Sequence, residues 1–289
     1  MPSVMRHPGP ILSFPSKVAN DENTFPSEVI GFDSRAALVV GHPGHELCVY
    51  GWLQVACPQV FVLTDGSGRS GLSRLGSTTR ILSQTNAKVG SIYGRFSDQA
   101  VYGAILDGDY ELFLRLSEEL ADEFVGGQIH YVAGDAMEGY NPTHDVCRLV
   151  LNTAVEMAQR SGHRIANFDF LLAGSLNPSF REAQGNRAIW VELDDTTFAS
   201  KLAAANAYSE LTPEVKTAIA QKGMDSFRIE CLRPASCNTL EKTFWKKAPF
   251  YEQYGERQVA AGYYQKIIRY REHVLPLSEA LRGQISRRR

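Results

Sequence analysis

Residues 36–46 read Ala-Ala-Leu-Val-Val-Gly-His-Pro-Gly-His-Glu, and this stretch decides the fold. Its first five residues are all apolar and two are β-branched, which is typical of a short strand buried on both faces. Gly41 ends the run, and apolar residues then recur at helical spacing over 46–56, before Pro58 stops the pattern. A buried strand joined by a short turn to a helix is the first unit of a parallel α/β sheet.

The same alternation continues along the chain. Further strands are predicted at 59–63, 90–93, 128–133, 166–172 and 188–193, and helices at 77–87, 110–125, 144–159 and 198–208. Strands separated by helices pair in parallel, so we expect an α/β, three-layer, Rossmann-like fold with a mostly parallel sheet and helices on both faces. Residues 1–36 are expected to form an irregular lead-in. Residues 211–289 are expected to form a C-terminal cap that includes an aromatic, basic helix around 263–270.

Composition excludes several classes of protein. The 289 residues carry 30 Lys and Arg against 32 Asp and Glu, and 44% are hydrophobic. A net charge of −2 argues against a nucleic-acid partner, and no apolar run approaches the ~20 residues that span a bilayer. The five cysteines show no Cys-x-x-Cys spacing, which is typical of reduced thiols. We therefore expect a cytoplasmic protein without a membrane span. The sequence does not decide whether the aromatic C-terminal segment forms a contact between subunits of an oligomer.

Three histidines follow predicted strands. His42 and His45 lie in the turn after the first strand, and His144 opens a predicted helix after a later strand. Ligands of open α/β sheets bind beyond the carboxyl ends of the strands, so we expect these imidazoles to meet at one edge. A single loop histidine is more often a hydrogen-bonded structural residue. Three imidazoles that leave a fourth position open, however, are a known way to hold catalytic zinc.

A glycine-rich loop, Gly-Ser-Gly-Arg-Ser-Gly at 66–71, follows the second predicted strand. As a dinucleotide fingerprint it would need a helix opening at once and an acidic residue at the end of the next strand. The helix starts later, and the next acid, Asp98, comes beyond any predicted strand end. We favour a loop that lets a substrate approach, with Arg69 or Arg74 meeting an anionic group. A plain exposed turn and a nucleotide-dependent oxidoreductase remain the alternatives.

The turn at 41–46, the Thr-Asp-Gly at 64–66 and the Asn-Pro-Thr-His at 141–144 resemble motifs of the zinc-dependent N-acetylglucosaminyl deacetylases of the PIG-L or LmbE-like kind. Those motifs read Ala-His-Pro-Asp-Asp-Glu, Thr-Asp/Asn-Gly and His-Pro-Asp-His, and the likeness makes 37–210 a deacetylase-type domain. It implies zinc, or another divalent metal, held by His42 and His144, with His45 at the place of a ligating Asp. It also implies de-N-acetylation of an acetylated amino sugar or small glycoconjugate by a zinc-activated water.

Two departures from these motifs affect the chemistry. Gly44 stands where the family has its general-base Asp, and Asn141 replaces a His that assists the tetrahedral intermediate. We expect Asp65 to supply the missing base, although an Asp in such a loop is equally typical of a turn. Glu46 is expected to orient a ligand His, and Tyr140 and Asn141 to offer donors to the substrate or its oxyanion. The alternative is a catalytically diverged relative that binds metal or sugar without hydrolysing it.

Overall fold

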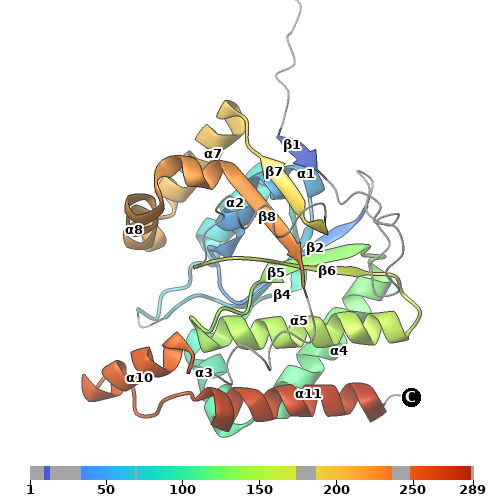
Figure 1. Ribbon diagram of the computed structural model, residues 1–289, viewed down its shortest axis with the longest axis vertical. Coiled ribbons are helices and arrows are strands. Elements are labelled where there is room, and N and C mark those ends of the chain that lie inside the picture. Colours follow the sequence, from blue (N-terminus) through green and yellow to red (C-terminus); the bar gives the residue numbers. More distant parts are fainter. Residues whose placement is uncertain (1–9, 14–33, 69, 174–186, 236–247, 288–289) are drawn as a thin grey trace, which may run out of the picture.

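The computed structural model describes residues 10–13, 34–68, 70–173, 187–235 and 248–287, and the statements that follow concern these residues. They contain one eight-stranded sheet with the strand order β1-β7-β8-β6-β5-β2-β3-β4 (Figure 1). The strands are β1 (Ile11–Ser13), β2 (Ala36–Val40), β3 (Gln59–Thr64), β4 (Lys88–Phe96), β5 (Tyr131–Asp135), β6 (Ala166–Phe170), β7 (Ile189–Glu192) and β8 (Ile229–Pro234).

The central part of the sheet is parallel. β2 pairs in parallel with both β3 and β5, β3 with β4, and β5 with β6. β8 pairs antiparallel with β6 and with β7, and β7 with β1. The α/β fold with a mostly parallel sheet is thus confirmed.

Helices cover both faces of this sheet. α1 (Tyr50–Ala56), α2 (Leu75–Thr85) and α7 (Asp195–Ala207) lie on one face. α3 (Asp98–Asp107), α4 (Tyr110–Gly126), α5 (Pro142–Arg160) and α11 (Leu275–Arg287) lie on the other (Figure 1). α8 (Thr212–Lys222) and α10 (Phe250–Ala260) lie at the periphery.

The alternation of side chains along β2 explains these two layers. Leu38 and Val40 belong to the core cluster under α1, α2 and α7, whereas Ala37 and Val39 belong to the cluster under α3, α4, α5 and α11. Successive side chains of a strand point to opposite faces, so a wholly apolar strand must be covered on both sides. β2 is fully buried, as its composition requires.

Strand order places a ligand-binding position between β2 and β5. The chain proceeds from β2 through β3 to β4 on one side, and from β5 to β6 on the other. The connections leave β2 and β5 in opposite directions at this point, and such a switch point is where open α/β sheets bind ligands. The loop after β2 carries His42 and His45, and the first turn of α5, which follows β5, carries His144.

The two ends of the chain differ from expectation. The lead-in contributes β1, which pairs with β7, and the cap segment contributes β8, which lies inside the sheet between β6 and β7. The prediction of a helix around 263–270 was wrong, because this stretch is irregular up to Tyr270 and the helices flank it as α10 and α11. Among the described residues, no helix is both long and apolar enough to cross a membrane.

Candidate functional site

Three imidazole rings lie side by side at the carboxyl edge of the sheet. His42 and His45 come from the loop after β2, and His144 is the third residue of α5. The ring centroids of His42 and His45 are 5.4 Å apart, those of His42 and His144 5.0 Å, and those of His45 and His144 4.5 Å. Neighbouring rings meet edge to face at 67–86°. The structure therefore brings together three residues that are separated by up to a hundred positions in the sequence.

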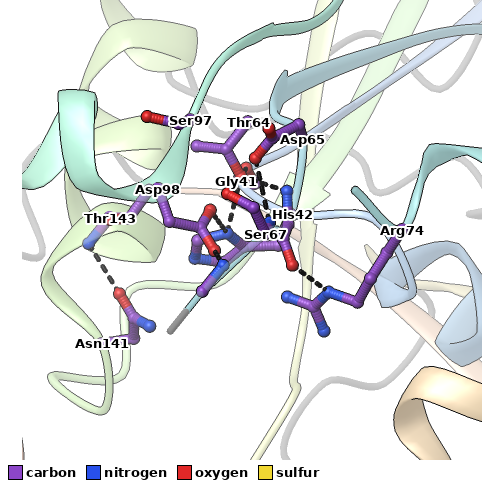
Figure 2. A network of polar contacts seen from close by, with 12 residues as sticks. Gly41, His42, Thr64, Asp65, Ser67, Arg74, Ser97, Asp98, Asn141 and Thr143 are labelled. Atoms are coloured by element: carbon purple, nitrogen blue, oxygen red, sulfur yellow. Dashed lines mark hydrogen bonds and ion pairs between the residues drawn. The ribbon is translucent and has the colours of Figure 1, made fainter. Parts of the chain in front are cut away.

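His42 is held through one of its two nitrogens. Its Nδ1 lies 2.8 Å from Oγ1 of Thr64 and 2.9 Å from Oδ1 of Asp98 (Figure 2). The Thr64 hydroxyl donates to the carbonyl of Gly41, so its oxygen and the Asp98 carboxylate both act as acceptors toward His42. Nδ1 is then the protonated nitrogen. Nε2 of His42 is buried and has no hydrogen-bond partner among the described residues.

His45 is held in the same way by a second carboxylate. Its Nδ1 lies 2.9 Å from both oxygens of Asp135, the last residue of β5. Oδ2 of Asp135 also accepts from the backbone N–H of Gly41 at 2.7 Å. This carboxylate is wholly buried and so ties the loop after β2 to the end of β5.

The carboxylate of Asp98 links His42 to the glycine-rich loop. Asp98 opens α3, and its Oδ2 accepts from the backbone N–H of Gly68 at 2.7 Å. Burial alone would raise the pKa of Asp98, but the hydrogen bonds from His42 and from the backbone N–H of Gly68 hold this pKa below its ordinary value. Asp98 was expected to lie beyond any strand end because the strand predicted at 90–93 stopped too early and α3 was not predicted, whereas β4 runs to Phe96. The Ser-Asp pair at 97–98 was the available signal, since Ser97 caps α3 by accepting from the backbone N–H of Ala100.

The rings of His42 and His144 are buried, and burial favours their neutral form. Burial lowers the pKa of His42, and lowers the pKa of His144 well below the ordinary value for histidine. The positive charge of Arg74 acts in the same direction on both groups. Neutral imidazole is the form that binds a metal ion.

Glu46 is buried close to the turn and to α2. Its Oε2 accepts from the backbone N–H of Gly44 at 2.7 Å, whereas its buried Oε1 has no hydrogen-bond partner among the described residues. Burial raises the pKa of this carboxyl group. The described contacts of Glu46 thus hold the shape of the loop that carries His42 and His45.

Asp65 and Arg74 organise the glycine-rich loop. Oδ1 of Asp65 accepts from the backbone N–H of Ser67 at 2.9 Å, and its carbonyl accepts from the N–H of Arg74. The guanidinium of Arg74 donates to the carbonyl of Gly66 (Figure 2). Asp65 therefore has the contacts of a turn residue, and Arg69 lies outside the described residues.

Asn141 and Tyr140 precede His144 in the loop between β5 and α5. The side-chain oxygen of Asn141 accepts from the N–H of Thr143 at 2.8 Å and so caps α5 (Figure 2). The amide NH₂ of Asn141 keeps its two donors for another acceptor. Tyr140 is exposed and stacks on Phe250 of α10.

A side chain at position 44 would strain the loop and displace a neighbouring leucine. Gly44 has φ +107°, a backbone conformation that is rare for any other residue. A Cβ placed there would lie 2.3 Å from Cδ1 of Leu211. The turn is therefore built around glycine, and Leu211 occupies the space that a longer residue would need.

The donor set fits zinc. Three imidazoles, of which His42 has a buried Nε2 without a hydrogen-bond partner among the described residues, are the kind of ligands that this ion prefers. Within the described part of the chain, no group of three or more His, Cys, Asp or Glu side chains is already arranged to hold a metal ion.

Comparison with known proteins yields fold neighbours alone. No family model matches the sequence, and no curated protein matches it. The A40926 pseudoaglycone deacetylase Dbv21 is 15% identical, with a TM-score of 0.44 over 70% of this chain and 96% of that one. The zinc-inhibited form of teicoplanin deacetylase Orf2 is 12% identical, with a TM-score of 0.45 over 79% and 94%.

A third structure, a deacetylase of the teicoplanin biosynthesis pathway in complex with bog, is 13% identical, with a TM-score of 0.48 over 70% of this chain and 99% of that one. With TM-scores below 0.5, these likenesses do not decide what this chain acts on.

Proposed function

We propose that this protein is a metal-dependent hydrolase, most simply a zinc enzyme that removes the acyl group of an acetylated amino sugar or small glycoconjugate. One observation carries the proposal. The imidazoles of His42, His45 and His144 lie within 5.4 Å of one another at the carboxyl edge of the sheet, and Nε2 of His42 is buried without a partner. Burying a polar nitrogen without a partner is costly, so a missing ligand is the simplest reason for the arrangement.

The hydrogen bonds indicate which nitrogens would hold the metal. Nδ1 of both His42 and His45 is engaged by a carboxylate, which leaves Nε2 of each ring, together with His144. A carboxylate on the far nitrogen fixes the orientation of a ligating imidazole and makes it more basic. A zinc ion bound there would polarise an amide carbonyl and lower the pKa of a water molecule to about 7.

The remaining groups of the chain would act on the substrate. The NH₂ group of Asn141 is suited to steady the negative charge that develops on the carbonyl oxygen. Arg74, whose charge is felt at His42 and His144, would meet an anionic or hydroxyl-rich part of the substrate. Asp65 is our candidate for the group that accepts the proton of the attacking water.

A binding protein without catalysis is the second candidate, and position 44 favours it. Glycine has no side chain that could take a proton, and Leu211 lies where a Cβ at position 44 would be, so this position offers no base to the imidazoles. If Asp65 serves only the turn, the site would bind metal or sugar without turnover.

Metal analysis and an activity assay distinguish the candidates. Protein without a His-tag should contain stoichiometric metal that is lost in His42→Ala and His144→Ala, whereas His163→Ala should retain it because that ring bonds the carbonyl of Ile129. Hydrolysis of N-acetylglucosamine derivatives that disappears in Asp65→Asn while metal stays bound would support the enzyme. Bound metal without any turnover would support the binding protein, and absence of metal from the wild type would exclude the hydrolase and every metal-binding form of the second candidate.

A further inference from the structure

Three exposed aromatic rings lie against one another beside the histidine site. Tyr140 and Phe250 stack with centroids 5.4 Å apart and planes 6° apart, and Tyr254 lies 6.3 Å beyond Phe250. Their exposed fractions are 53%, 44% and 38%. We call Tyr140, Phe250 and Tyr254 the aromatic shelf. The guanidinium of Arg257 lies 5.6 Å from the centroid of Phe250.

Two backbone contacts fix the shelf to the first turn of α5. The N–H of Gly139 donates to Oδ1 of Asp145, the residue after His144, at 3.2 Å. The carbonyl of Gly139 accepts from the N–H of Tyr251 at 3.2 Å, and the Tyr251 ring is buried in the core. α10 is thereby held against the loop that carries Tyr140, close to the start of α5 (Figure 1). The rings are pre-organised, which lowers the entropic cost of binding a ligand.

The shelf lies within reach of a molecule bound at the imidazoles. Tyr140 and His144 are four residues apart, so their Cα atoms are separated by at most about 14 Å even if the chain between them were extended. A sugar ring on the shelf and an acyl group at the histidines can therefore belong to one substrate of modest size.

The area of the shelf argues for a small ligand over a protein partner. A fully exposed aromatic side chain presents about 150–250 Å², so three rings at these exposed fractions offer roughly 300 Å². A stable protein interface needs about 800 Å² from each partner. A few hundred Å² of stacked ring surface instead matches one face of a sugar ring together with its linkage.

We infer that the aromatic shelf is a binding subsite for a second pyranose ring, linked to the amino sugar whose acyl group reaches the histidines. This inference rests on the proposed function. The C–H face of the sugar would lie on Tyr140, the most exposed of the three rings, which the stacked ring of Phe250 supports from behind, and the N–H donors of Arg257 would serve its hydroxyl groups. The preferred substrate is then an oligosaccharide or glycoconjugate of at least two rings.

Titration calorimetry on the metal-free protein tests the shelf without any need for turnover. The ligands are N-acetylglucosamine and its β-1,4-linked disaccharide. The wild type should bind the disaccharide more tightly than the monosaccharide. Phe250→Ala and Tyr140→Ala should reduce that advantage by about 3- to 10-fold, the worth of one aromatic contact. Tyr263→Ala is the matched control, since this tyrosine is 64% exposed and lies beyond the end of α10.

The outcomes separate the subsite from the activity. Equal binding of the two sugars by the wild type, or a disaccharide advantage that survives both shelf substitutions, would overturn the inference whatever the hydrolysis assay gives. Loss of the advantage in Phe250→Ala but also in Tyr263→Ala would overturn it as well. If the disaccharide binds through the shelf and neither sugar is hydrolysed, the subsite stands and the proposed hydrolase activity fails.

Discussion

Oδ1 of Asp98 lies 2.9 Å from Nδ1 of His42, although β3 separates the strands that precede these two residues in the sheet. His42 follows β2 and Asp98 follows β4, so this contact crosses above the end of β3. Thr64, the last residue of β3, lies between them and bonds to the same nitrogen. Three strand ends thus jointly set the orientation of one imidazole.

Removing the carboxylate of Asp98 should weaken the proposed metal site. Asp98→Ala leaves His42 with Thr64 alone, and loss of a carboxylate that orients a ligating histidine typically costs 10- to 100-fold in metal affinity. Competition with a chelator of known zinc affinity measures the change. In the metal-free protein, ¹⁵N-edited NMR should show the Nδ1–H tautomer of His42 in the wild type and a shift toward Nε2–H in Asp98→Ala.

Asp65→Asn is the control for this experiment, because the Asp65 carboxylate bonds to Ser67 and to no imidazole nitrogen among the described contacts. This variant should keep the zinc affinity of the wild type and the Nδ1–H tautomer of His42. An unchanged His42 tautomer in Asp98→Ala would show that Thr64 alone holds the ring.

Restoring an acidic residue at position 44 should destabilise the protein without creating a base. Gly44→Asp combines a strained backbone at φ +107° with a Cβ 2.3 Å from Leu211 Cδ1, and we expect the free energy of unfolding to fall by about 2 kcal/mol or more. Urea denaturation measures this change in the free energy of unfolding. Gly71→Ala isolates the backbone effect, since Gly71 has φ +70° with nothing within 4 Å of its Cβ position.

A substitution of Leu211 tests the contact between this residue and a side chain at position 44. Leu211→Ala should recover part of the stability that Gly44→Asp loses, because it removes the atom that the new Cβ meets. A Gly44→Asp variant as stable as the wild type would mean that this turn adapts freely.

The buried ion pair of Lys201 and Glu230 should be essential for stability. Nζ of Lys201 lies 2.9 Å from Oε1 of Glu230. Oε1 also accepts from the backbone N–H of Gly51, and Oε2 accepts from that of Trp52, both at the start of α1. Glu230→Ala leaves a buried cation uncompensated, so the free energy of unfolding should fall by about 3–5 kcal/mol. The control is Glu111, which forms an exposed ion pair with Arg115. Glu111→Ala should leave the midpoint of urea denaturation unchanged.

Thiol labelling should separate the cysteines by burial. Burial raises the pKa of Cys48 to about 12 and raises that of Cys147 further, whereas Cys57 is exposed. An ordinary thiol is substantially ionised at pH 9, but Cys48 stays protonated there and so remains a poor nucleophile. Alkylation of the native protein at pH 8 to 9, followed by peptide mass mapping, should modify Cys57 well before Cys48 and Cys147. Comparable labelling of Cys48 would show that the loop after β2 opens in solution.

The parallel half of the fold could be predicted from the sequence because its elements are defined locally. β2 and β3 are continuous apolar runs, and the turn after each contains glycine, so their limits were predicted to within a residue. β8 could not be found in this way. Its run Ile-Glu-Cys-Leu-Arg-Pro contains a glutamate that is buried by pairing with Lys201, a condition that exists in the folded protein alone.

The same reasoning applies to the site. The strand-end rule brought His42, His45 and His144 to one edge, where the structure has them, and their role as metal ligands stays a prediction. The pairing of Asp98 with His42 and of Asp135 with His45 could not be predicted. Asp98 follows β4 and Asp135 ends β5, and the positions of these strands relative to β2 are known only from the sheet order of the folded protein.

The position of β8 has a consequence for how the protein is synthesised. β7 leaves the ribosome before β8 does, yet β8 lies between β6 and β7, so β7 has no place in the sheet until residue 234 has emerged. Throughout that interval the nascent chain presents the open edge of β6, a template for pairing with other chains. Production of this protein should accordingly depend on chaperones that shield the edge, and fragments ending before β8 should accumulate in inclusion bodies.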